Sequence, residues 1–344
     1  MPAPVAHRHY PANLAEFVAW FSTDEDCRDY LRWLRWPDGF RCPECDEPGW
    51  ELGNGRHECV ACHLRTSLTA GTIFDGPRLP LTLWFHAAWL FSTNKDGVSA
   101  SALKRQLDLH SYQTAWTMLT KFRVATAHQD RTRLSGEVEV DETLFGGLTQ
   151  GLRGRAPGAK VLIGIAVERV PGAGFGRCRM GVLPSANAGN LRAFIDANIE
   201  PGSTIYTDGW AGYGTALRNA PYQHVPTVAP GAQVARVLPG VHRIASLFKR
   251  WVLGTHQGSV GWDHVALYLD EFVFRFNRRR SRHRGLVFLR LMELAVEHSA
   301  VRYKDLTPNV GRSKGQPRTP PPTVGRGLTA SVERPRADRP WRAP

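Results

Sequence analysis

The sequence predicts an α/β protein, in which a mixed sheet is preceded by a small cysteine-rich module and a helical segment and followed by an unstructured tail. Three observations support this prediction. Four of the six cysteines lie between Cys42 and Cys62. The apolar periodicity changes from helical spacing to strand-like alternation at Gly136. The chain from Leu306 onward is rich in Pro, Gly and Arg.

Size and charge narrow the class of protein. With 344 residues, 42% of them hydrophobic, the chain is long enough to bury the cores of two or three domains. The net charge of +13 predicts a polyanionic partner, nucleic acid before membrane. The longest apolar stretch, residues 81–91, is far shorter than the ~20 residues that span a bilayer. The N-terminus also lacks the apolar core of a signal peptide, so we expect a cytoplasmic protein without a membrane partner.

The N-terminal region predicts two short amphipathic helices over residues 12–36 and a zinc ribbon over residues 37–75. Two C-x2-C pairs separated by thirteen residues supply the ligands, which are Cys42, Cys45, Cys59 and Cys62. In a chain that is not exported, this spacing indicates four thiolates around one Zn²⁺ rather than disulfides. No open coordination position is evident, so the predicted role of the metal is structural.

Residues 78–128 predict a DNA-binding helix-turn-helix segment. Two helical patterns follow Gly97 with a short joint around residues 108–111, and the second helix could enter a major groove. Its predicted outward-facing, DNA-contacting side chains are Gln113, Thr114, Thr117 and Lys121. The alternative is an ordinary helical linker, because two-helix patterns are common.

Residues 134–285 predict the α/β domain itself. The order of elements is three strands, helix, strand, helix, strand and helix, which is the order of an RNase H-like domain. Asp141 lies in the first strand and Asp208 ends the fourth, and these strands are neighbours in such a sheet. Two converging carboxylates can hold the two divalent metals that phosphodiester chemistry uses. Taken singly, Asp208 could be only a turn residue and Asp141 only a solvated strand residue.

Six segments resemble a known family of bacterial insertion-sequence transposases that carry an N-terminal zinc ribbon. They are FRCPEC…CVAC, GTIF, EVDETLFGG, YTDGWAGY, HRIASLFKRWVLGTHQG and YLDEFVFRFNRR. This group is numbered fifteen-ninety-five and has an ISXO-two-like catalytic domain, and the resemblance runs from about residue 17 to residue 280.

The resemblance implies a DDE-type transposase that binds terminal inverted repeats, cleaves the transposon ends and joins the 3′-OH to target DNA. It implies two Mg²⁺ or Mn²⁺ ions as catalytic cofactors, with Asp141 and Asp208 in the first two catalytic positions. Pairing of two ends implies a homodimer or a higher oligomer. A bacterial enzyme of this kind is expected to associate with the nucleoid.

The third catalytic position departs from the commonest family pattern, Asn-x-Ile-Glu-Ser. This chain has Ala245 where that pattern has Glu, and His242 where it has Asn. The resemblance permits His at this position, followed seven residues on by a Lys, here Lys249, on the same helix face. An imidazole suits Mn²⁺ better than Mg²⁺. His242 could instead face solvent, and Glu271, 63 positions after Asp208, is the alternative third ligand.

Basic residues outside the predicted acidic site are expected to contact DNA phosphates. Lys249 and Arg250 are predicted to contact the transposon end, and Arg278, Arg279 and Arg280 belong to an arginine cluster after the last long helix. The predicted disordered tail, residues 306–344, has eight Lys or Arg residues against two acidic ones. High salt should therefore weaken DNA binding steeply. Glu139 and Glu142, which flank Asp141, are assigned by default to the surface.

Two other classes of function remain open from the sequence. A zinc-ribbon regulator would bind DNA without cutting it, and an RNase H-like structure-specific nuclease would cut without joining.

Overall fold

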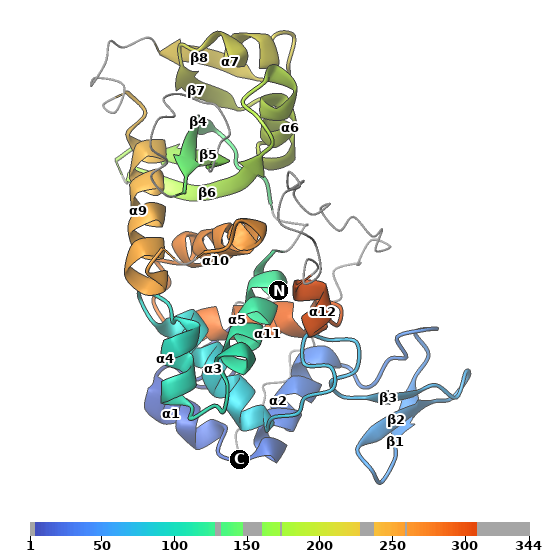
Figure 1. Cartoon of the computed structure of the whole chain (residues 1–344). Coiled ribbons are helices and arrows are strands. Elements are labelled where there is room, and N and C mark those ends of the chain that lie inside the picture. The colour runs from blue at the N-terminus through green and yellow to red at the C-terminus, as the bar shows by residue number, and fades with distance from the viewer. Residues whose placement is uncertain are drawn as a thin grey trace. The chain divides into compact units, whose positions relative to one another are not determined.

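The computed structural model describes residues 4–127, 132–146, 160–172, 174–227, 237–258 and 260–307. They form two compact units: the first runs to Thr126 and resumes at Ser281, and the second extends from Ala127 to Arg280 (Figure 1). The predicted tail lies outside the described residues apart from Leu306 and Thr307. No helix in the described ranges has the length and apolarity needed to cross a bilayer.

The first unit is built from helices that surround an aromatic core. The helices are α1 (Leu14–Trp20), α2 (Asp24–Arg35), α3 (Leu81–Thr93), α4 (Ala100–Gln106), α5 (Tyr112–Thr126), α11 (Arg284–Glu297) and α12 (Tyr303–Leu306). Local side chains begin several of them. Thr23 and Asp26 form a capping box at α2, and the Ser99 side chain accepts a hydrogen bond from the Ala102 amide at α4. The helices expected over residues 12–36 and 81–94 and the two that follow are all present.

Helix α11 returns the C-terminal part of the chain to this unit, and the sequence analysis assigned no element to it. Phe288 is fully buried and contacts the rings of Phe17, Phe21 and Phe85 from the N-terminal helices. The Gly285 position is equally close-packed, since a Cβ there would lie 1.6 Å from the Pro11 carbonyl oxygen. The core of the first unit is therefore assembled from both ends of the chain.

A small antiparallel sheet in the first unit carries the cysteines. Its strands are β1 (Gly49–Glu51), β2 (Arg56–Cys59) and β3 (Arg65–Ser67), in the order β1-β2-β3. The predicted turn between the cysteine pairs is the β1–β2 turn, where Gly55 has a φ of 73°. Gly49 is required for a different reason, because a Cβ there would lie 2.1 Å from the Glu58 carbonyl oxygen.

The second unit contains a five-stranded mixed sheet. The strands are β4 (Glu137–Phe145), β5 (Val161–Val170), β6 (Gly174–Leu183), β7 (Thr204–Asp208) and β8 (Gln223–Thr227). Their order is β6-β5-β4-β7-β8, with β5 antiparallel to both neighbours and β7 parallel to β4 and β8. Three antiparallel strands followed by two parallel ones, with the first strand in the centre, form an RNase H-like sheet, as expected.

Helices cover both faces of this sheet (Figure 1). Helices α9 (Pro239–His256) and α10 (Val265–Asn277), the latter preceded by the 3-10 turn η2 (Trp262–His264), share one core with the sheet. Helices α6 (Ala188–Asn198) and α7 (Ala211–Ala216) share the other. Strand β4 alternates between the cores: Val138 and Val140 face α6 and α7, so Glu139 and Asp141 face the side of α9.

Candidate active site and zinc site

The four cysteines of the ribbon form a compact cluster that fits a zinc ion. Their sulfur atoms all lie within 4.8 Å of one another, with Cys42 Sγ 3.5 Å from Cys62 Sγ and Cys45 Sγ 3.4 Å from Cys59 Sγ. Four thiolates at about 2.3 Å from a tetrahedral Zn²⁺ would be separated by roughly 3.8 Å. The predicted ligand set is thus assembled in space.

The two predicted catalytic aspartates lie on neighbouring parallel strands. The pairing of β4 with β7 joins Val138 to Ile205 and Glu139 to Tyr206. Two residues further along each strand, on the same face, come Asp141 and Asp208. The pairing of the two strands ends at Glu139 and Tyr206, so each aspartate lies two residues beyond the last paired position of its strand.

Tyr213 on α7 contacts the part of β4 that carries Asp141. Its buried hydroxyl donates a 2.7 Å hydrogen bond to Glu142 Oε2. Burial raises the pKa of Tyr213 well above its usual value, and the nearby charges of Glu142, Asp141 and Asp208 raise it further. One hydroxyl on α7 therefore lies within electrostatic reach of both aspartates.

Local hydrogen bonds orient the aspartate side chains. Asp208 Oδ1 accepts from the Trp210 amide at 3.1 Å, at the start of α7, and Asp141 Oδ1 accepts from the Glu142 amide at 2.8 Å. These bonds use one oxygen of each carboxylate. Asp208 is therefore a turn residue at the end of β7. This role is compatible with its predicted role as a catalytic residue, because the turn hydrogen bond uses only one of its carboxylate oxygens.

Helix α9 carries the predicted third ligand along the same face of β4. At its start, Glu139 accepts hydrogen bonds from the amides of Gly240 and Val241. Further along, Lys249 Nζ donates to Thr143 Oγ1 at 2.8 Å. Nine helical residues rise about 13.5 Å, and four strand residues about 13 Å, so the helix runs alongside the strand. Asp141 thus lies level with the part of α9 between these contacts, where His242 is found.

The side chain of His242 has an unusual environment within the described part of the chain. It is half-buried, and its Nε2 atom is buried without a hydrogen-bond partner. Because His242 lies seven residues before Lys249, the two share the helix face that contacts β4. An imidazole nitrogen of this kind can bind a divalent cation such as Mn²⁺.

Glu271, the alternative third ligand, lies elsewhere in the unit. It is fully buried on α10, and α10 packs along β6. Two strands, β5 and β4, separate β6 from β7 in the sheet order. Helix α9, which carries His242, packs on β4 and β5, whereas α10, which carries Glu271, packs along β6.

The predicted DNA-contacting residues of α5 differ in their exposure. Gln113 is exposed, and Thr114 and Thr117 are half-buried, each with its hydroxyl hydrogen-bonded locally. The prediction that Lys121 points outward is wrong. Its side chain is buried, its Nζ donates to the Ile73 carbonyl at 2.8 Å, and it lies 5.5 Å from the centre of the Trp84 ring. Lys121 fastens the segment after the ribbon to the helices.

The basic residues of the second unit also fall into two groups. Lys249, Arg250 and Arg280 are exposed. Arg279 instead donates to the carbonyl oxygens of Phe175 and Gly176 on β6 and stacks on the Phe276 ring. Arg278 stacks on the Phe274 ring of its own helix. These two side chains hold α10 and β6 in place, which leaves Arg280 as the exposed member of this predicted phosphate-contacting set.

Sequence reasoning missed two residues of the site. Glu139, assigned to the surface, is fully buried and contacts α9, and Tyr213 was not singled out. The strand alternation that places Asp141 on one face also places Glu139 there, and that signal could have identified it. Nothing local to Tyr213 indicates that its hydroxyl meets Glu142, which lies 71 positions away in the chain.

Two family models match this chain, and solved structures show a distant likeness to it. Residues 133–277 match the ISXO2-like transposase domain, and residues 22–65 match the transposase zinc-ribbon domain. Among solved structures, the catalytic core domain of BIV integrase is 17% identical, covers 44% of this chain and 89% of its own, and gives a TM-score of 0.30. The Mos1 transposase paired-end complex with the left transposon end is 14% identical, covers 59% and 72%, and gives 0.29. Among curated proteins, none matches the chain.

The two matched domains together span more than half of the 344 residues, and each coincides with a structural feature described above. The ribbon model spans the four-cysteine cluster, and the catalytic-domain model spans the RNase H-like sheet with both aspartates and His242. The chain therefore belongs to the IS1595 family of transposases, which joins a zinc ribbon to an ISXO2-like catalytic domain.

Proposed function

We propose that this transposase binds the terminal inverted repeats of an insertion sequence, cleaves its ends and joins each 3′-OH to target DNA. The observation that supports this proposal is that Asp141 and Asp208 follow the last paired positions of two adjacent parallel strands, while the neighbouring helix α9 carries His242 with a buried Nε2 that has no hydrogen-bond partner. Two Mg²⁺ or Mn²⁺ ions held by these residues would activate the attacking oxygen and stabilise the leaving one. Such a protein would act at the bacterial nucleoid.

Each part of the chain has a proposed role in this reaction. Asp141 and Asp208 hold the metal ions, and His242 completes the set. Lys249 and Arg250, exposed on α9, contact phosphates of the transposon end. The ribbon and the α4–α5 segment bind the end sequence, and Zn²⁺ bound by Cys42, Cys45, Cys59 and Cys62 stabilises the ribbon. Pairing of two ends requires a homodimer or a higher oligomer.

The test combines the full chain, labelled transposon-end DNA, a plasmid target and Mn²⁺. The wild type should give joined products, and both D141A and D208A should bind the ends but give neither cleavage nor joining. D196A is the matched control, because Asp196 is a half-buried aspartate on α6 whose partners are Arg192 at 2.7 Å and the Tyr222 hydroxyl at 2.8 Å. Joining by D141A or D208A would refute the active-site assignment. Cleavage without joining would favour a nuclease, and bound but intact DNA would favour a regulator.

The third position is tested in the same assay. H242A should slow cleavage strongly while leaving a measurable residual rate, whereas E271Q, which preserves the volume of a buried side chain, should cleave at the wild-type rate. H242E should shift the enzyme toward Mg²⁺, because a carboxylate suits Mg²⁺ better than an imidazole does. Loss of cleavage in E271Q with normal activity in H242A would reverse the assignment.

A further inference from the structure

Helix α9 begins without a capping side chain of its own, and a distant carboxylate takes that place. The residue at its N-cap position, Leu238, makes no side-chain hydrogen bond. Glu139 on β4, 101 positions before Gly240, accepts from the Gly240 amide at 2.7 Å and from the Val241 amide at 3.1 Å through Oε2. Helix N-termini present free amides and a partial positive charge, and both favour a carboxylate. A single side chain therefore joins the central strand to the first turn of α9.

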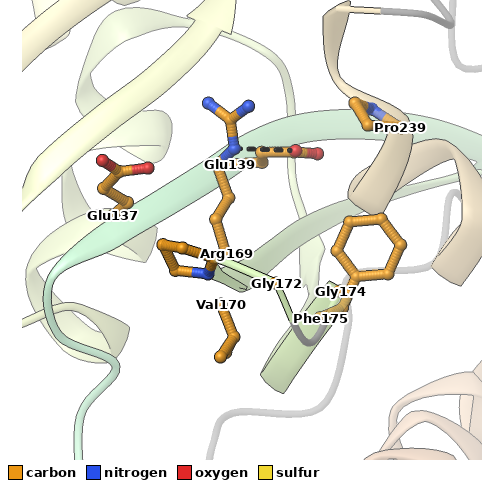
Figure 2. Close-up of a pocket in the computed structure, with 9 residues that line it drawn as sticks. Glu137, Glu139, Arg169, Val170, Gly172, Gly174, Phe175 and Pro239 are labelled. Atoms are coloured by element: carbon orange, nitrogen blue, oxygen red, sulfur yellow. Dashed lines mark ion pairs between the residues drawn. The ribbon is translucent and has the colours of Figure 1, made fainter.

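Neighbouring strands hold Glu139 in turn. Its Oε1 lies 3.5 Å from Arg169 Nε on β5, and the Arg169 guanidinium lies 4.4 Å from the centre of the Tyr206 ring on β7. Figure 2 shows the Glu139–Arg169 pair beside Pro239, at the start of α9, in a pocket of about 390 Å³. Arg169 thus contacts both Glu139 on β4 and Tyr206 on β7. Glu139 lies two residues before Asp141, and Tyr206 lies two residues before Asp208.

The start of α9 packs so closely against the sheet that no side chain fits at Gly240. A Cβ at Gly240 would lie 2.8 Å from Glu139 Oε2, 2.8 Å from Val167 Cγ1 and 2.9 Å from Phe175 Cε1. Real Cβ atoms do not approach heavy atoms this closely, so glycine lets the helix backbone meet the carboxylate. Close packing of this kind fixes the height of α9 along β4.

Glu139 therefore connects the two elements that the proposed active site must align. It lies two residues before Asp141 on the same face of β4, and it bonds the amide of Val241, which immediately precedes His242. We propose that Glu139 is a positioning residue, which sets the distance of His242 from Asp141 and Asp208 by fixing the first turn of α9. This inference rests on the proposed function and assigns a role to a residue that touches neither metal nor DNA.

If Glu139 only stabilised the fold, E139A would act like any other substitution that weakens the sheet. Glu168 provides the matched control for that case. Glu168 lies next to Arg169 on β5, is also largely buried, accepts the Arg177 amide at 2.8 Å, and pairs with the Arg177 guanidinium. Its side chain is on the opposite face of β5 from Arg169, so E168A weakens the same sheet without touching α9. E139Q is the conservative variant, because its side-chain oxygen can still accept the two amides.

The first experiment uses the full chain without DNA and follows the histidine ring signals by NMR while Mn²⁺ is added. H242A identifies the His242 signal. Paramagnetic Mn²⁺ should broaden this signal in the wild type, E139Q and E168A, but not in E139A. Selective broadening retained in E139A would overturn the positioning role. Absence of selective broadening in the wild type would overturn the His242 assignment, and with it this inference. D141A removes a proposed metal ligand and leaves Glu139 in place, so it should also lose the broadening. Broadening retained in D141A would show that Mn²⁺ reaches His242 at another site, which would refute the proposed function and not the role of Glu139.

The second experiment measures end cleavage in a double-mutant cycle. E139A should slow cleavage on the order of 10–100-fold, as expected for misplacement of a catalytic group by about 1 Å, with an unchanged Kd for the end. In an H242A background the same substitution should produce no further loss, because its target is already absent. E168A should have the same small effect in both backgrounds. An equal loss from E139A with and without His242 would show that Glu139 only stabilises the fold.

Discussion

Replacing Gly240 by Ala should destabilise the second unit, although the same replacement stabilises most helices. Alanine normally gains up to about 1 kcal/mol over glycine within a helix. At Gly240 the added methyl group would lie under 3.0 Å from three side-chain atoms, contributed by Glu139, Val167 and Phe175. Overpacking of a well-packed core costs about 1–3 kcal/mol, and three simultaneous contacts put this site at the upper end. The net loss should be about 2 kcal/mol.

Gly254, on the same helix, is the matched control, because a Cβ there meets no atom within 4 Å. For a unit of roughly 150 residues, 1 kcal/mol shifts Tm by about 2–4 °C. Thermal unfolding of the full chain, followed by hydrogen exchange at β4 and β5, should show G240A lower by about 4–8 °C. G254A should be unchanged or about 1–3 °C higher. If G240A unfolds at the wild-type temperature, the close approach of α9 to Glu139 does not exist.

Three further predictions concern other parts of the chain. Treatment with a chelator should release about one Zn²⁺ per chain, measured by a colorimetric assay, and C42S should lose the same ion. Either change should unfold the ribbon and leave hydrogen exchange in β4 and β5 unchanged. Loss of protection from hydrogen exchange in both units would contradict a local role of the metal. Burial raises the pKa of Glu168, but hydrogen bonds from Arg177 outweigh burial, and the pKa is lowered from its usual value of 4.5. The stability that Glu168 contributes is therefore fully present at pH values above 4.5 and is lost as the pH falls through the lowered pKa. E168Q should therefore flatten the pH dependence of urea unfolding between about pH 3 and 5, and an unaltered profile would exclude this contribution. Deleting residues 308–344 should reduce the slope of log Kd against log salt concentration by about 0.9 per lost phosphate contact. Affinity should fall equally for specific and non-specific DNA. An unchanged slope would show that the tail does not contact DNA.

The elements that the sequence predicted well are those with a strong local pattern. Alternation in residues 137–145 identified β4, and the C-x2-C pairs identified the ribbon ligands, because spacing alone determines which side chains meet. Helix α9 begins at Pro239, a start that its local sequence does not mark. Its cap comes from Glu139, which is remote in the chain, so no local capping residue marks the boundary.

Other features depended on tertiary contacts that periodicity cannot reveal. Lys121 occupies a polar-looking position of α5, yet its amino group reaches the Ile73 carbonyl inside the first unit. In the sequence, Glu139 has the pattern of a solvated strand residue, and it is buried because α9 packs over it. The positions of His242 and Glu271 relative to the sheet likewise depend on tertiary structure, because both residues follow Asp208 on helices and only the fold shows that α9 packs on β4 and α10 on β6.

The burial of Phe288 among N-terminal aromatic rings makes the catalytic unit an insertion within another domain. During synthesis, the helices up to Thr126 emerge first but lack α11, which is made only after the whole inserted unit. The inserted unit can therefore complete its core before the domain that surrounds it, reversing the usual N-to-C order of folding. A gene copy truncated between residues 127 and 283 would encode an N-terminal half with an unfilled aromatic core. Such a copy should yield an aggregating or degraded fragment, and not a stable DNA-binding competitor of the full-length enzyme.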